Sequence, residues 1–280
     1  MDLDAYRERS LATWNEIASG WDEERRFMWA ATRPVSEWLV EHASPQPGNT
    51  LLELACGTGD TGFLVAEAVG REGRVVMTDF SEGMLEAAQR EAERRGIENV
   101  EFRRLDAEKM DLDDSSFDGV ICRWGYMLMA DPAAAFSETH RVLREGGRVS
   151  FAAWAEPERN LWASITGKAM VELGHQPPPE PGAPGMFSFA DHERIRELVT
   201  GAGFAEPQVE QVTVKFGWAD VDQHWEKTLQ TAGPLVVAYR DADEEERERI
   251  RTTVTSRVEE RLESGDPLDG ITNVVVAEKR

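Results

Sequence analysis

A run of small residues after a short apolar segment is the part of this 280-residue chain best suited to chemistry. Residues 50–55 read as a buried strand. Gly57, Gly59 and Gly62 then follow with G-x-G-x-x-G spacing. Glycines at these positions let the backbone turn sharply and approach a ligand without an intervening Cβ. This spacing alone is weak evidence for a particular ligand, because plain tight turns and dinucleotide-binding enzymes have the same spacing. It predicts a strand, a nucleotide-type loop and a helix that starts at Asp60.

A second apolar segment places a carboxylate where a nucleoside would need one. Residues 73–78 read as a strand that ends on Asp79, twenty positions after Gly59. A carboxylate at this place can accept hydrogen bonds from both hydroxyls of a ribose. The glycine loop and this acid together predict a two-part nucleoside site.

Two further strands are predicted at residues 100–105 and 117–122, and they end at Asp106 and Arg123. In parallel sheets, ligands bind beyond the carboxyl ends of the strands, where the strand order reverses. A lone aspartate is more often a turn residue or a helix cap. Four polar or glycine-rich strand ends in succession nevertheless indicate a single crevice.

The elements that must position these residues alternate along the chain. Helices are predicted at residues 60–69, from the capping Ser81 to Gly96, and from Asp131-Pro132 to Gly146, with a strand at 148–154. Repeated strand and helix units of this length predict an α/β fold with a doubly wound, Rossmann-like parallel sheet.

The first 49 residues form a separate predicted unit, an N-terminal helical cap. Aromatic and aliphatic residues recur at helical spacing over residues 3–21, and a second short helix is predicted to begin at Pro34. The turn-rich linker of residues 44–49 ends this cap. The main domain therefore spans residues 50–280. Two interpretations stay open for the aromatic residues of this N-terminal cap. They could pack on the edge of the sheet, or they could form a helical lid that presents aromatic faces to a ligand.

Composition limits the possible partners. The net charge is -22, from 53 acidic and 31 basic residues, which argues against nucleic acid and anionic membrane surfaces as partners. No run of eighteen apolar residues occurs and the N-terminus is acidic, so we expect a soluble cytoplasmic protein. The two cysteines, Cys56 and Cys122, make neither a disulfide framework nor a zinc site, and no metal is expected.

Four segments in order carry a family resemblance. Residues 53–60 (ELACGTGD), 76–85 (VMTDFSEGML), 105–108 (LDAE) and 140–147 (HRVLREGG) resemble the successive motifs of class I S-adenosylmethionine-dependent methyltransferases. Within that superfamily they are most similar to the ubiquinone/menaquinone C-methyltransferase type. The resemblance covers roughly residues 50–154. It implies a seven-stranded sheet in which the last two strands, at 209–216 and 271–277, form an antiparallel edge.

The resemblance also implies S-adenosylmethionine as cofactor, S-adenosylhomocysteine as product, and a set of cofactor-binding residues. These are Glu53, Gly57, Thr58, Gly59, Asp79, Phe80, Met84, Asp106, Ala107 and Arg123. Asp79 would hold the ribose hydroxyls, and Phe80 and Met84 would flank the adenine. Asp106 would accept a hydrogen bond from the exocyclic amine of the adenine, and the backbone of Ala107 would contact the edge of the adenine ring. The glycine loop would run beside the methionine part of the cofactor. Arg123 would line the same methionine end, where family members often have a small or polar residue instead of an arginine.

Methyl transfer from a sulfonium is an in-line displacement, for which positioning can supply about 7 to 11 kcal/mol. Neither a metal nor a covalent nucleophile is required, so no catalytic residue is predicted and no histidine is singled out as a base. The predicted acceptor contacts are Trp21, Trp124, Tyr126 and Met127, for which ordinary packing is the competing interpretation.

Two insertions are predicted on the side of the sheet where the acceptor would bind, at about residues 155–187 and 217–268. They would form a cap over the acceptor site or a dimer contact. They contain predicted helices at 157–174, 221–231 and 243–262 and a Pro/Gly-rich loop at 176–185; a helix opened by Ser188 and reaching Thr200 is predicted next. The predicted acceptor is a small molecule, with a quinone-like or polyketide-like aromatic as the hypothesis, and the chain is expected to be a monomer or homodimer.

Two other functions stay open at the level of sequence. A nicotinamide-dependent oxidoreductase would share the glycine spacing and the acid, but no Tyr-x-x-x-Lys pair is evident. A noncatalytic protein that binds S-adenosylmethionine would carry the same motifs, because methyl transfer requires no obligatory catalytic residue.

Overall fold

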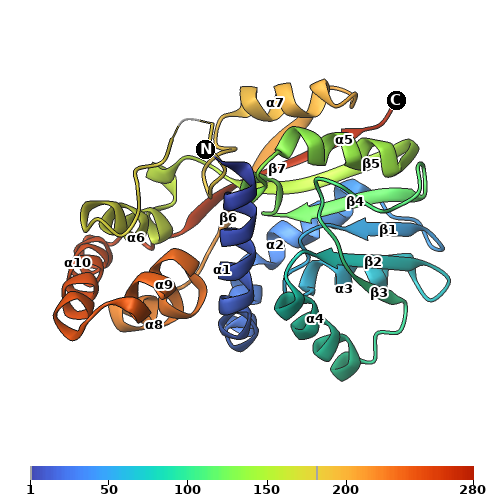
Figure 1. The fold of residues 1–280 in the computed structure, drawn as a ribbon. Helices are drawn as coiled ribbons and strands as arrows, with labels where there is room; N and C mark the ends of the chain where they lie inside the picture. The colour runs from blue at the N-terminus through green and yellow to red at the C-terminus, as the bar shows by residue number, and fades with distance from the viewer. Residues whose placement is uncertain (1, 181) are drawn as a thin grey trace.

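The computed structural model describes residues 2–180 and 182–280, which form an α/β fold around one seven-stranded sheet (Figure 1). The strand order is β3-β2-β1-β4-β5-β7-β6. Strands β1 to β5 are parallel, whereas β7 runs antiparallel to both β5 and β6. The strands are β1 (Thr50–Glu53), β2 (Arg74–Asp79), β3 (Val100–Arg104), β4 (Phe117–Arg123), β5 (Leu143–Trp154), β6 (Gln208–Val214) and β7 (Gly270–Glu278). The predicted doubly wound sheet with its antiparallel edge is confirmed.

The helices begin and end where local capping chemistry allows. Ser81 accepts a hydrogen bond from the Met84 amide at the start of α4, and Gly96 ends that helix at φ 67°. Asp131 caps α5 in the same way, as predicted. The helices are α1 (Leu3–Glu23), α2 (Arg25–Ala43), α3 (Asp60–Val69), α4 (Glu82–Arg95), α5 (Pro132–Val142), α6 (Leu161–Glu172), α7 (His192–Gly201), α8 (Val221–Thr231), α9 (Gly233–Asp241) and α10 (Glu244–Glu263), with 3₁₀ turns at Tyr126–Leu128 and Pro157–Arg159.

Helix α2 differs from the prediction, because it begins at Arg25 and carries Pro34 in its interior. An interior proline removes one backbone hydrogen bond and normally kinks or ends a helix. Here the apolar stripe on both sides of the proline is buried against the sheet, and that burial outweighs the lost bond. The stripe consists of Met28, Ala31, Val35 and Leu39.

Other predicted boundaries were wrong as well, including the ends of β1 and α5, which stop at Glu53 and Val142. Ser188 does not open α7; its hydroxyl donates to the Met127 carbonyl at 2.7 Å, and Asp191 caps the helix by accepting from the Glu193 amide at 2.9 Å. Local spacing assigned Ser188 to the helix cap, but its hydroxyl is bonded to a carbonyl 61 positions away in the chain. Strand β5 begins at Leu143, five residues before the predicted start, and α9 was not predicted.

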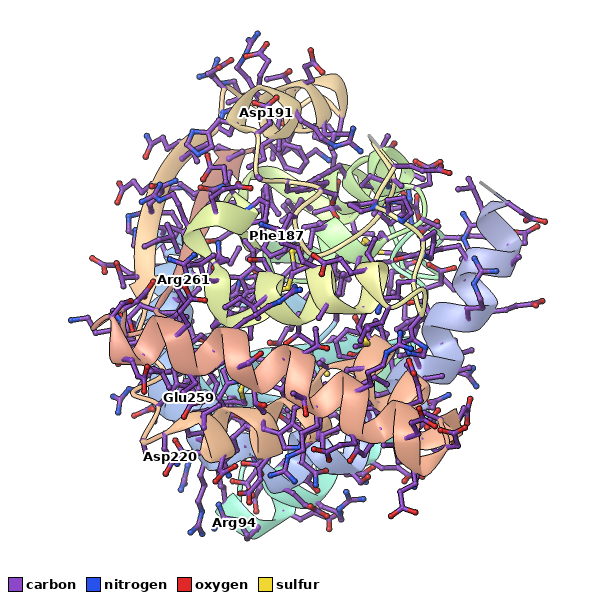
Figure 2. All side chains as sticks on the ribbon, turned by 90° about the vertical axis from the view of Figure 1, so that its left-hand side faces the viewer. Arg94, Phe187, Asp191, Asp220, Glu259 and Arg261 are labelled. Atoms are coloured by element: carbon purple, nitrogen blue, oxygen red, sulfur yellow. The ribbon has the colours of Figure 1, made fainter. Side chains whose placement is uncertain are left out.

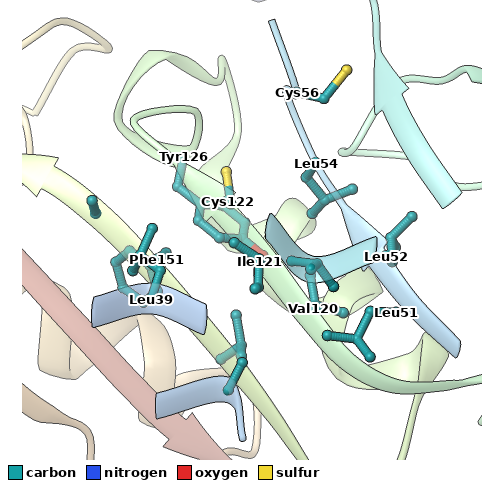
Figure 3. Close-up of a cluster of buried hydrophobic side chains, with 14 of the residues drawn as sticks. Leu39, Leu51, Leu52, Leu54, Cys56, Val120, Ile121, Cys122, Tyr126 and Phe151 are labelled. Atoms are coloured by element: carbon teal, nitrogen blue, oxygen red, sulfur yellow. The ribbon is translucent and has the colours of Figure 1, made fainter. Parts of the chain in front are cut away.

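The core lies on both faces of the central strands. Leu51 and Leu52 on β1 and Val120 and Ile121 on β4 are 1% exposed or less (Figure 3). Helices α2 and α3 cover one face, and α5, packed against α7, covers the other. Burial on both faces explains why these strands read as continuous apolar runs and not as alternating patterns.

Helix α1 lies between the sheet and a second group of helices. It contacts α4 on one side and α8 and α9 on the other, and the arrows of β1 and β4 point toward it in Figure 1. We call α6, α8, α9 and α10 the cap. The cap has its own apolar cluster, which includes Ile165, Trp225 and Val254. Figure 2 views this side with α10 in front, and Glu259 and Arg261 lie on that helix.

Within the part of the chain that the structure describes, no helix combines the length and apolarity needed to cross a bilayer.

Candidate active site

The loop between β1 and α3 has an unusual backbone. Ala55, Gly57 and Gly59 have φ angles of 51°, 54° and 90°, in the left-handed region that favours glycine. A Cβ built on Gly59 would lie 2.7 Å from Phe63 Cζ, so this position has no room for a side chain. The Cys56 amide donates to the Thr78 carbonyl at 2.9 Å, which holds the loop against the end of β2. The loop therefore presents bare backbone at the carboxyl edge of the sheet.

Asp79 lies beside this loop at the end of β2. Its two carboxylate oxygens accept from the Gly57 amide at 3.0 Å and the Ser81 amide at 2.9 Å. The residue is 6% exposed. Burial raises the pKa of Asp79 to about 6, and the hydrogen bonds from Ser81 and Gly57 act in the opposite direction. The predicted acid and the predicted glycine loop are thus joined directly.

Glu53 is the last residue of β1 and is 2% exposed. Its Oε2 atom has no hydrogen-bond partner among the described residues. Burial raises the pKa of Glu53 to about 8, although the nearby charge of Arg123 lowers it. An unpaired buried carboxyl is costly. It is well suited to a cationic group that enters the site.

Arg123 ends β4 on the same side of the sheet as α2. Its Nη1 donates to Thr32 Oγ1 at 2.7 Å and to Ser36 Oγ at 3.3 Å, and its guanidinium carbon lies 5.1 Å from the Trp124 ring centroid. Burial lowers the pKa of Arg123, and the carboxyls of Asp60 and Glu53 oppose that shift. Both of these hydrogen-bond partners are neutral hydroxyls, and no carboxylate of the described residues forms a direct ion pair with Arg123.

Arg25 provides a contrast, and sequence reasoning missed it. This residue of α2 is 6% exposed and donates through Nε and Nη2 to both carboxylate oxygens of Asp60, at 2.9 and 2.8 Å. Its Nη1 lies 2.8 Å from Glu91 Oε2 on α4, and Arg95 pairs with the same two acids. The network joins α2, α3 and α4 beneath the glycine loop. No sequence signal predicts it, because the partners are 35 to 66 positions from Arg25.

We call the ends of β1 and β2 with the loops that follow them, residues 53–59 and 79–81, the nucleoside edge, after the site that the sequence predicts there. Helix α1 passes over this edge. Asn15 Oδ1 accepts from Ser81 Oγ at 2.8 Å and from the Gly83 amide at 3.4 Å. A Cβ on Gly83 would lie 2.9 Å from Ala18 Cβ, so the two helices touch. Met84 is 1% exposed and packs under α1 beside Ile17 and Ala18.

The other predicted adenine contacts lie at the rim of this edge. Phe80 and Ala107 are partly exposed, and Asp106 is exposed, with Oδ1 accepting from the Glu108 amide at 2.9 Å. Glu108 in turn binds Arg7 of α1 at 2.5 Å and accepts from the Ala130 amide at 2.7 Å. The first turns of α1 are therefore fastened to the loops after β3 and β4.

Aromatic rings line the carboxyl ends of β4 and β5 and continue toward the cap. Trp124 stacks on Trp154 with centroids 4.5 Å apart, and Trp162 meets Trp154 edge-on at 5.1 Å. Phe216 and Trp218, which follow β6, and Phe27 of α2 extend the contact chain. We call these residues the aromatic wall: Phe27, Trp124, Trp154, Trp162, Phe216 and Trp218.

The four predicted acceptor contacts lie in different surroundings. Trp124 belongs to the aromatic wall, and Trp21 is half-buried at the junction of α1 and the cap, where Nε1 donates to the Thr231 carbonyl at 3.1 Å. Tyr126 is 1% exposed in the core, where its hydroxyl pairs with Thr139 Oγ1 at 2.6 Å and its ring lies among Phe136 and Phe151 (Figure 3). Met127 is also buried.

Within residues 2–180 and 182–280, no three metal-ligating side chains of the His, Cys, Asp or Glu types gather in one place. Cys56 and Cys122 are both free and buried. Burial raises the pKa of the Cys122 thiol to about 12, so it packs as a small apolar group and not as a nucleophile.

Known proteins resemble this chain in sequence. A family model described as a methyltransferase domain matches residues 45–173. The chain is 37% identical over 179 residues to demethylmenaquinone methyltransferase of Staphylococcus epidermidis, covering 60% of this chain and 73% of that protein. It is 33% identical over 234 residues to the ubiquinone/menaquinone biosynthesis C-methyltransferase UbiE of Brucella anthropi, covering 81% and 80%. The chain belongs to the class I S-adenosylmethionine-dependent methyltransferases of the UbiE type.

The fold agrees with this family. The YcgJ protein from Bacillus subtilis superposes with a TM-score of 0.58 at 16% identity, over 89% of this methyltransferase and 99% of that chain. Identity this low supports the fold alone. The methyltransferase uses S-adenosylmethionine to methylate a small molecule, as the motifs predicted, and a nicotinamide-dependent activity is not favoured.

Proposed function

We propose that the carboxyl edge of β1 and β2 binds S-adenosylmethionine through Asp79 and Glu53. The Asp79 carboxylate lies where ribose hydroxyls can reach it, next to the Gly57 amide. Oε2 of Glu53 has no partner among the described residues, and the positive charge of the cofactor's ammonium group would lower the pKa of Glu53 and stabilise its ionised form. The cofactor supplies an electrophilic methyl group on a sulfonium. The shape and charge of this edge fit such a group, because bare backbone and two acids lie together.

The rim residues complete the proposed cofactor site. Phe80 and Ala107 would contact the adenine, and the exposed carboxylate of Asp106 would accept from its amine. Thr58 and Gly59 would follow the methionine part along the loop. Met84 lies under α1, so contact between its side chain and the adenine requires α1 to move away from α4.

Arg123 has the properties needed at the methionine end. Arg25 is neutralised by ion pairs with Asp60 and Glu91, whereas among the described residues Arg123 donates only to the hydroxyls of Thr32 and Ser36. A cationic group without a carboxylate partner can accept one from a ligand at little cost in existing contacts. We therefore assign Arg123 to the carboxylate of the cofactor.

The acceptor is a flat aromatic small molecule of the quinone-like or polyketide-like kind. The aromatic wall is the observation that carries this proposal, because flat rings stack favourably on Trp and Phe side chains at 4.5 to 7 Å. Relatives of this methyltransferase are named for methylation of menaquinone and ubiquinone precursors. Tyr126 and Met127 are omitted from the proposed acceptor site, since the Tyr126 ring packs among Phe136 and Phe151 in the core and Met127 is 3% exposed.

Segments far apart in the sequence enclose this acceptor. Residues 1–49 contribute α1 and α2, and the insertions at about 155–187 and 217–268 in the domain of residues 50–280 contribute the cap. Trp21 ties α1 to the cap through the Thr231 carbonyl. These residues would exclude water and hold the acceptor atom in line with the methyl group, which is the main requirement of this displacement.

The chain is proposed to act in the cytoplasm as a monomer or homodimer without nucleic acid. The net charge of -22 disfavours polyanions as partners. Free, buried Cys56 and Cys122 suit a reducing compartment.

Turnover with an acceptor panel tests this function. Purified protein would be incubated with S-adenosylmethionine and a set of hydroquinones, naphthols and anthraquinones, together with aliphatic amines and small carboxylic acids as non-aromatic controls. S-adenosylhomocysteine and the methylated product would be measured by mass spectrometry. We expect product from aromatic acceptors alone.

Methylation of only the non-aromatic acceptors would contradict the proposed acceptor class. Binding of S-adenosylmethionine without turnover of any acceptor, at concentrations well above those that saturate binding, would favour a noncatalytic binding protein.

A further inference from the structure

Two hydroxyl groups of α2 lie beside the apolar stripe that this helix buries. Thr32 and Ser36 are 1% and 0% exposed and stand one helical turn apart, on either side of the buried Val35. A hydroxyl removed from water is costly unless it is hydrogen-bonded. Both hydroxyls receive a hydrogen bond from Nη1 of Arg123, at 2.7 and 3.3 Å. The two buried hydroxyls are therefore spent on holding one arginine.

The hydrogen atoms of these hydroxyls have partners of their own. A guanidinium group only donates, so Thr32 Oγ1 and Ser36 Oγ accept from Arg123. Thr32 Oγ1 donates to the Met28 carbonyl at 2.8 Å within α2. Ser36 Oγ lies 3.0 Å from Thr61 Oγ1 on α3, an oxygen that can accept its hydrogen. Each hydroxyl is thus oriented with a lone pair toward the arginine, and α2 and α3 together fix its Nη1 end.

The other two nitrogens of Arg123 remain available for a ligand. Nε and Nη2 make no hydrogen bond to any described residue, and neither counts among the fully enclosed polar atoms that lack a partner, so both reach accessible space. Arg25 shows what this pair of donors binds. Its Nε and Nη2 donate to the two carboxylate oxygens of Asp60, at 2.9 and 2.8 Å. Two parallel hydrogen bonds of this kind match a carboxylate in geometry and charge.

The opposite charge needed for an amino acid lies on the neighbouring strand. Glu53 on β1 pairs in register with Ile121 on β4, two residues before Arg123. Oε2 of Glu53 has no partner among the described residues, while Asp60 is already bonded to Arg25. A carboxyl and a pair of guanidinium donors thus end adjacent parallel strands. An α-amino acid carries an ammonium and a carboxylate on one carbon, which such a pair can bind together.

We propose that Thr32 and Ser36 are positioning residues that hold Nη1 of Arg123 and so direct Nε and Nη2 to the carboxylate of the cofactor's methionine part. The inference rests on the assignment of Arg123 in the proposed function, and it adds that α2 sets the selectivity for ligands with a free carboxylate. Hydroxyls suit this role, because they orient the guanidinium without neutralising its charge. A side chain that is already held at one end also loses less freedom when it binds.

A matched pair of ligands tests the inference without turnover. S-adenosylhomocysteine carries the carboxylate, and S-adenosyl-3-thiopropylamine is the same molecule without it. Calorimetric titration would give the ratio of their dissociation constants for each protein. We expect wild type to bind S-adenosylhomocysteine at least about 30-fold more tightly. Arg123→Met should reduce this ratio to about threefold or less, and Thr32→Val, which keeps the shape and loses the hydroxyl, to about tenfold or less.

Three further variants separate positioning from packing. Thr32→Ser keeps the hydroxyl and should retain the ratio within about twofold of wild type, and Ser36→Ala should lower the ratio less than Thr32→Val, since its contact is the longer one. Thr228→Val is the matched control. Thr228 is buried in α8 and donates to the carbonyl four positions earlier at 2.7 Å, but it bonds no arginine among the described residues. It should keep the wild-type ratio, because a general loss of packing weakens both ligands alike.

The outcomes distinguish this inference from the proposed function. If Arg123→Met lowers the ratio while Thr32→Val and Ser36→Ala both keep it, the positioning role is overturned and the assignment of Arg123 stands. A Thr32→Ser ratio as low as that of Thr32→Val would also overturn the role, because the hydroxyl would not be its cause. A wild-type ratio in Arg123→Met would overturn the carboxylate contact itself, and the inference with it. If Thr32→Val does not fold, Ser36→Ala decides.

Discussion

The nucleoside edge of the sheet and the cap are held together in opposite ways. At the nucleoside edge, Gly57, Asp79 and Ser81 are joined by backbone amides and a carboxylate, and Arg25 and Asp60 form an ion pair beneath them. At the cap, a cluster of apolar side chains packs between the helices, and ion pairs such as Arg257–Glu172 and Arg251–Asp222 lie at the surface. Hydrogen bonds and close backbone contacts are directional, whereas ring packing adapts to shape.

This difference matches what each region must recognise. A cofactor that is the same for a whole family can be bound by fixed backbone and carboxylate groups. The acceptor differs between enzymes, and we propose that side chains on the inserted helices bind it, since these helices can vary without disturbing the sheet. We therefore expect substitutions at the nucleoside edge to have large effects on binding or stability. Comparable substitutions at the cap surface should have small ones.

Asp79→Ala should have the largest effect. It removes the carboxylate that organises Gly57 and Ser81 and that we propose binds the ribose. Hydrogen bonds to charged groups are worth about 1.5 to 3 kcal/mol each, so affinity for S-adenosylhomocysteine should fall by at least about 100-fold. Isothermal titration calorimetry would measure it. Asp113→Ala, at an exposed aspartate in the loop before β4, should bind like wild type. Equal affinities would contradict the site assignment.

Arg25→Ala should cause the next largest change, in stability. It leaves Asp60 and Glu91 buried with less compensation, and breaking a buried ion pair costs about 3 to 5 kcal/mol. Since Arg95 still pairs with both acids, we expect the lower end of that range in urea unfolding. Arg33→Ala breaks an exposed pair with Glu37 on the same helix and should cost less than about 1 kcal/mol. Similar losses in the two variants would show that the buried network adds nothing.

A pair of glycine substitutions compares the two regions directly. A Cβ on Gly62 of α3 would lie 2.2 Å from Glu53 Oε2 and 2.6 Å from Met77 Cε, whereas a Cβ on Gly167 of α6 has nothing within 4 Å. Gly62→Ala should lower the free energy of unfolding by about 1 to 3 kcal/mol. Gly167→Ala should raise it by about 0.5 to 1 kcal/mol, because alanine favours the helix. Changes of the same sign would remove the proposed contrast.

Glu53→Gln should change the pH dependence of stability. The folded protein holds a proton on Glu53 up to about pH 8, whereas the reference value for glutamate is 4.5. Between these values the folded state binds more protons than the unfolded state, so the free energy of unfolding falls as pH rises. Glutamine does not titrate. It should therefore flatten the slope by up to about 1.4 kcal/mol per pH unit.

Urea unfolding of wild type and Glu53→Gln between pH 6 and 8 would measure this difference. Asp79 titrates at about pH 6, so most of its contribution lies below that window. Glu37→Gln, at an exposed position, should show the wild-type slope. A Glu53→Gln slope equal to that of wild type would mean that Glu53 is already ionised in the folded protein.

Much of the nucleoside edge could be predicted because its parts are local. The glycine spacing fixed the loop, and helix α3 begins at Asp60 and ends at Val69, as its sequence pattern indicated. The order of strand ends brought Asp79 to the loop, since parallel strands present their carboxyl ends at one edge. Sequence spacing did not predict that α1 would be the element that packs on Met84, because the two are more than sixty residues apart.

The sequence by itself determined the fold class, the family and the cofactor, because these depend on short motifs and on the alternation of apolar strands and helices. Only the tertiary structure decided which aromatic residues form the wall and that Tyr126 belongs to the core. It alone revealed that Arg25 pairs with Asp60. Such features arise from contacts between remote segments, whose free energy depends on burial and geometry that no local pattern records.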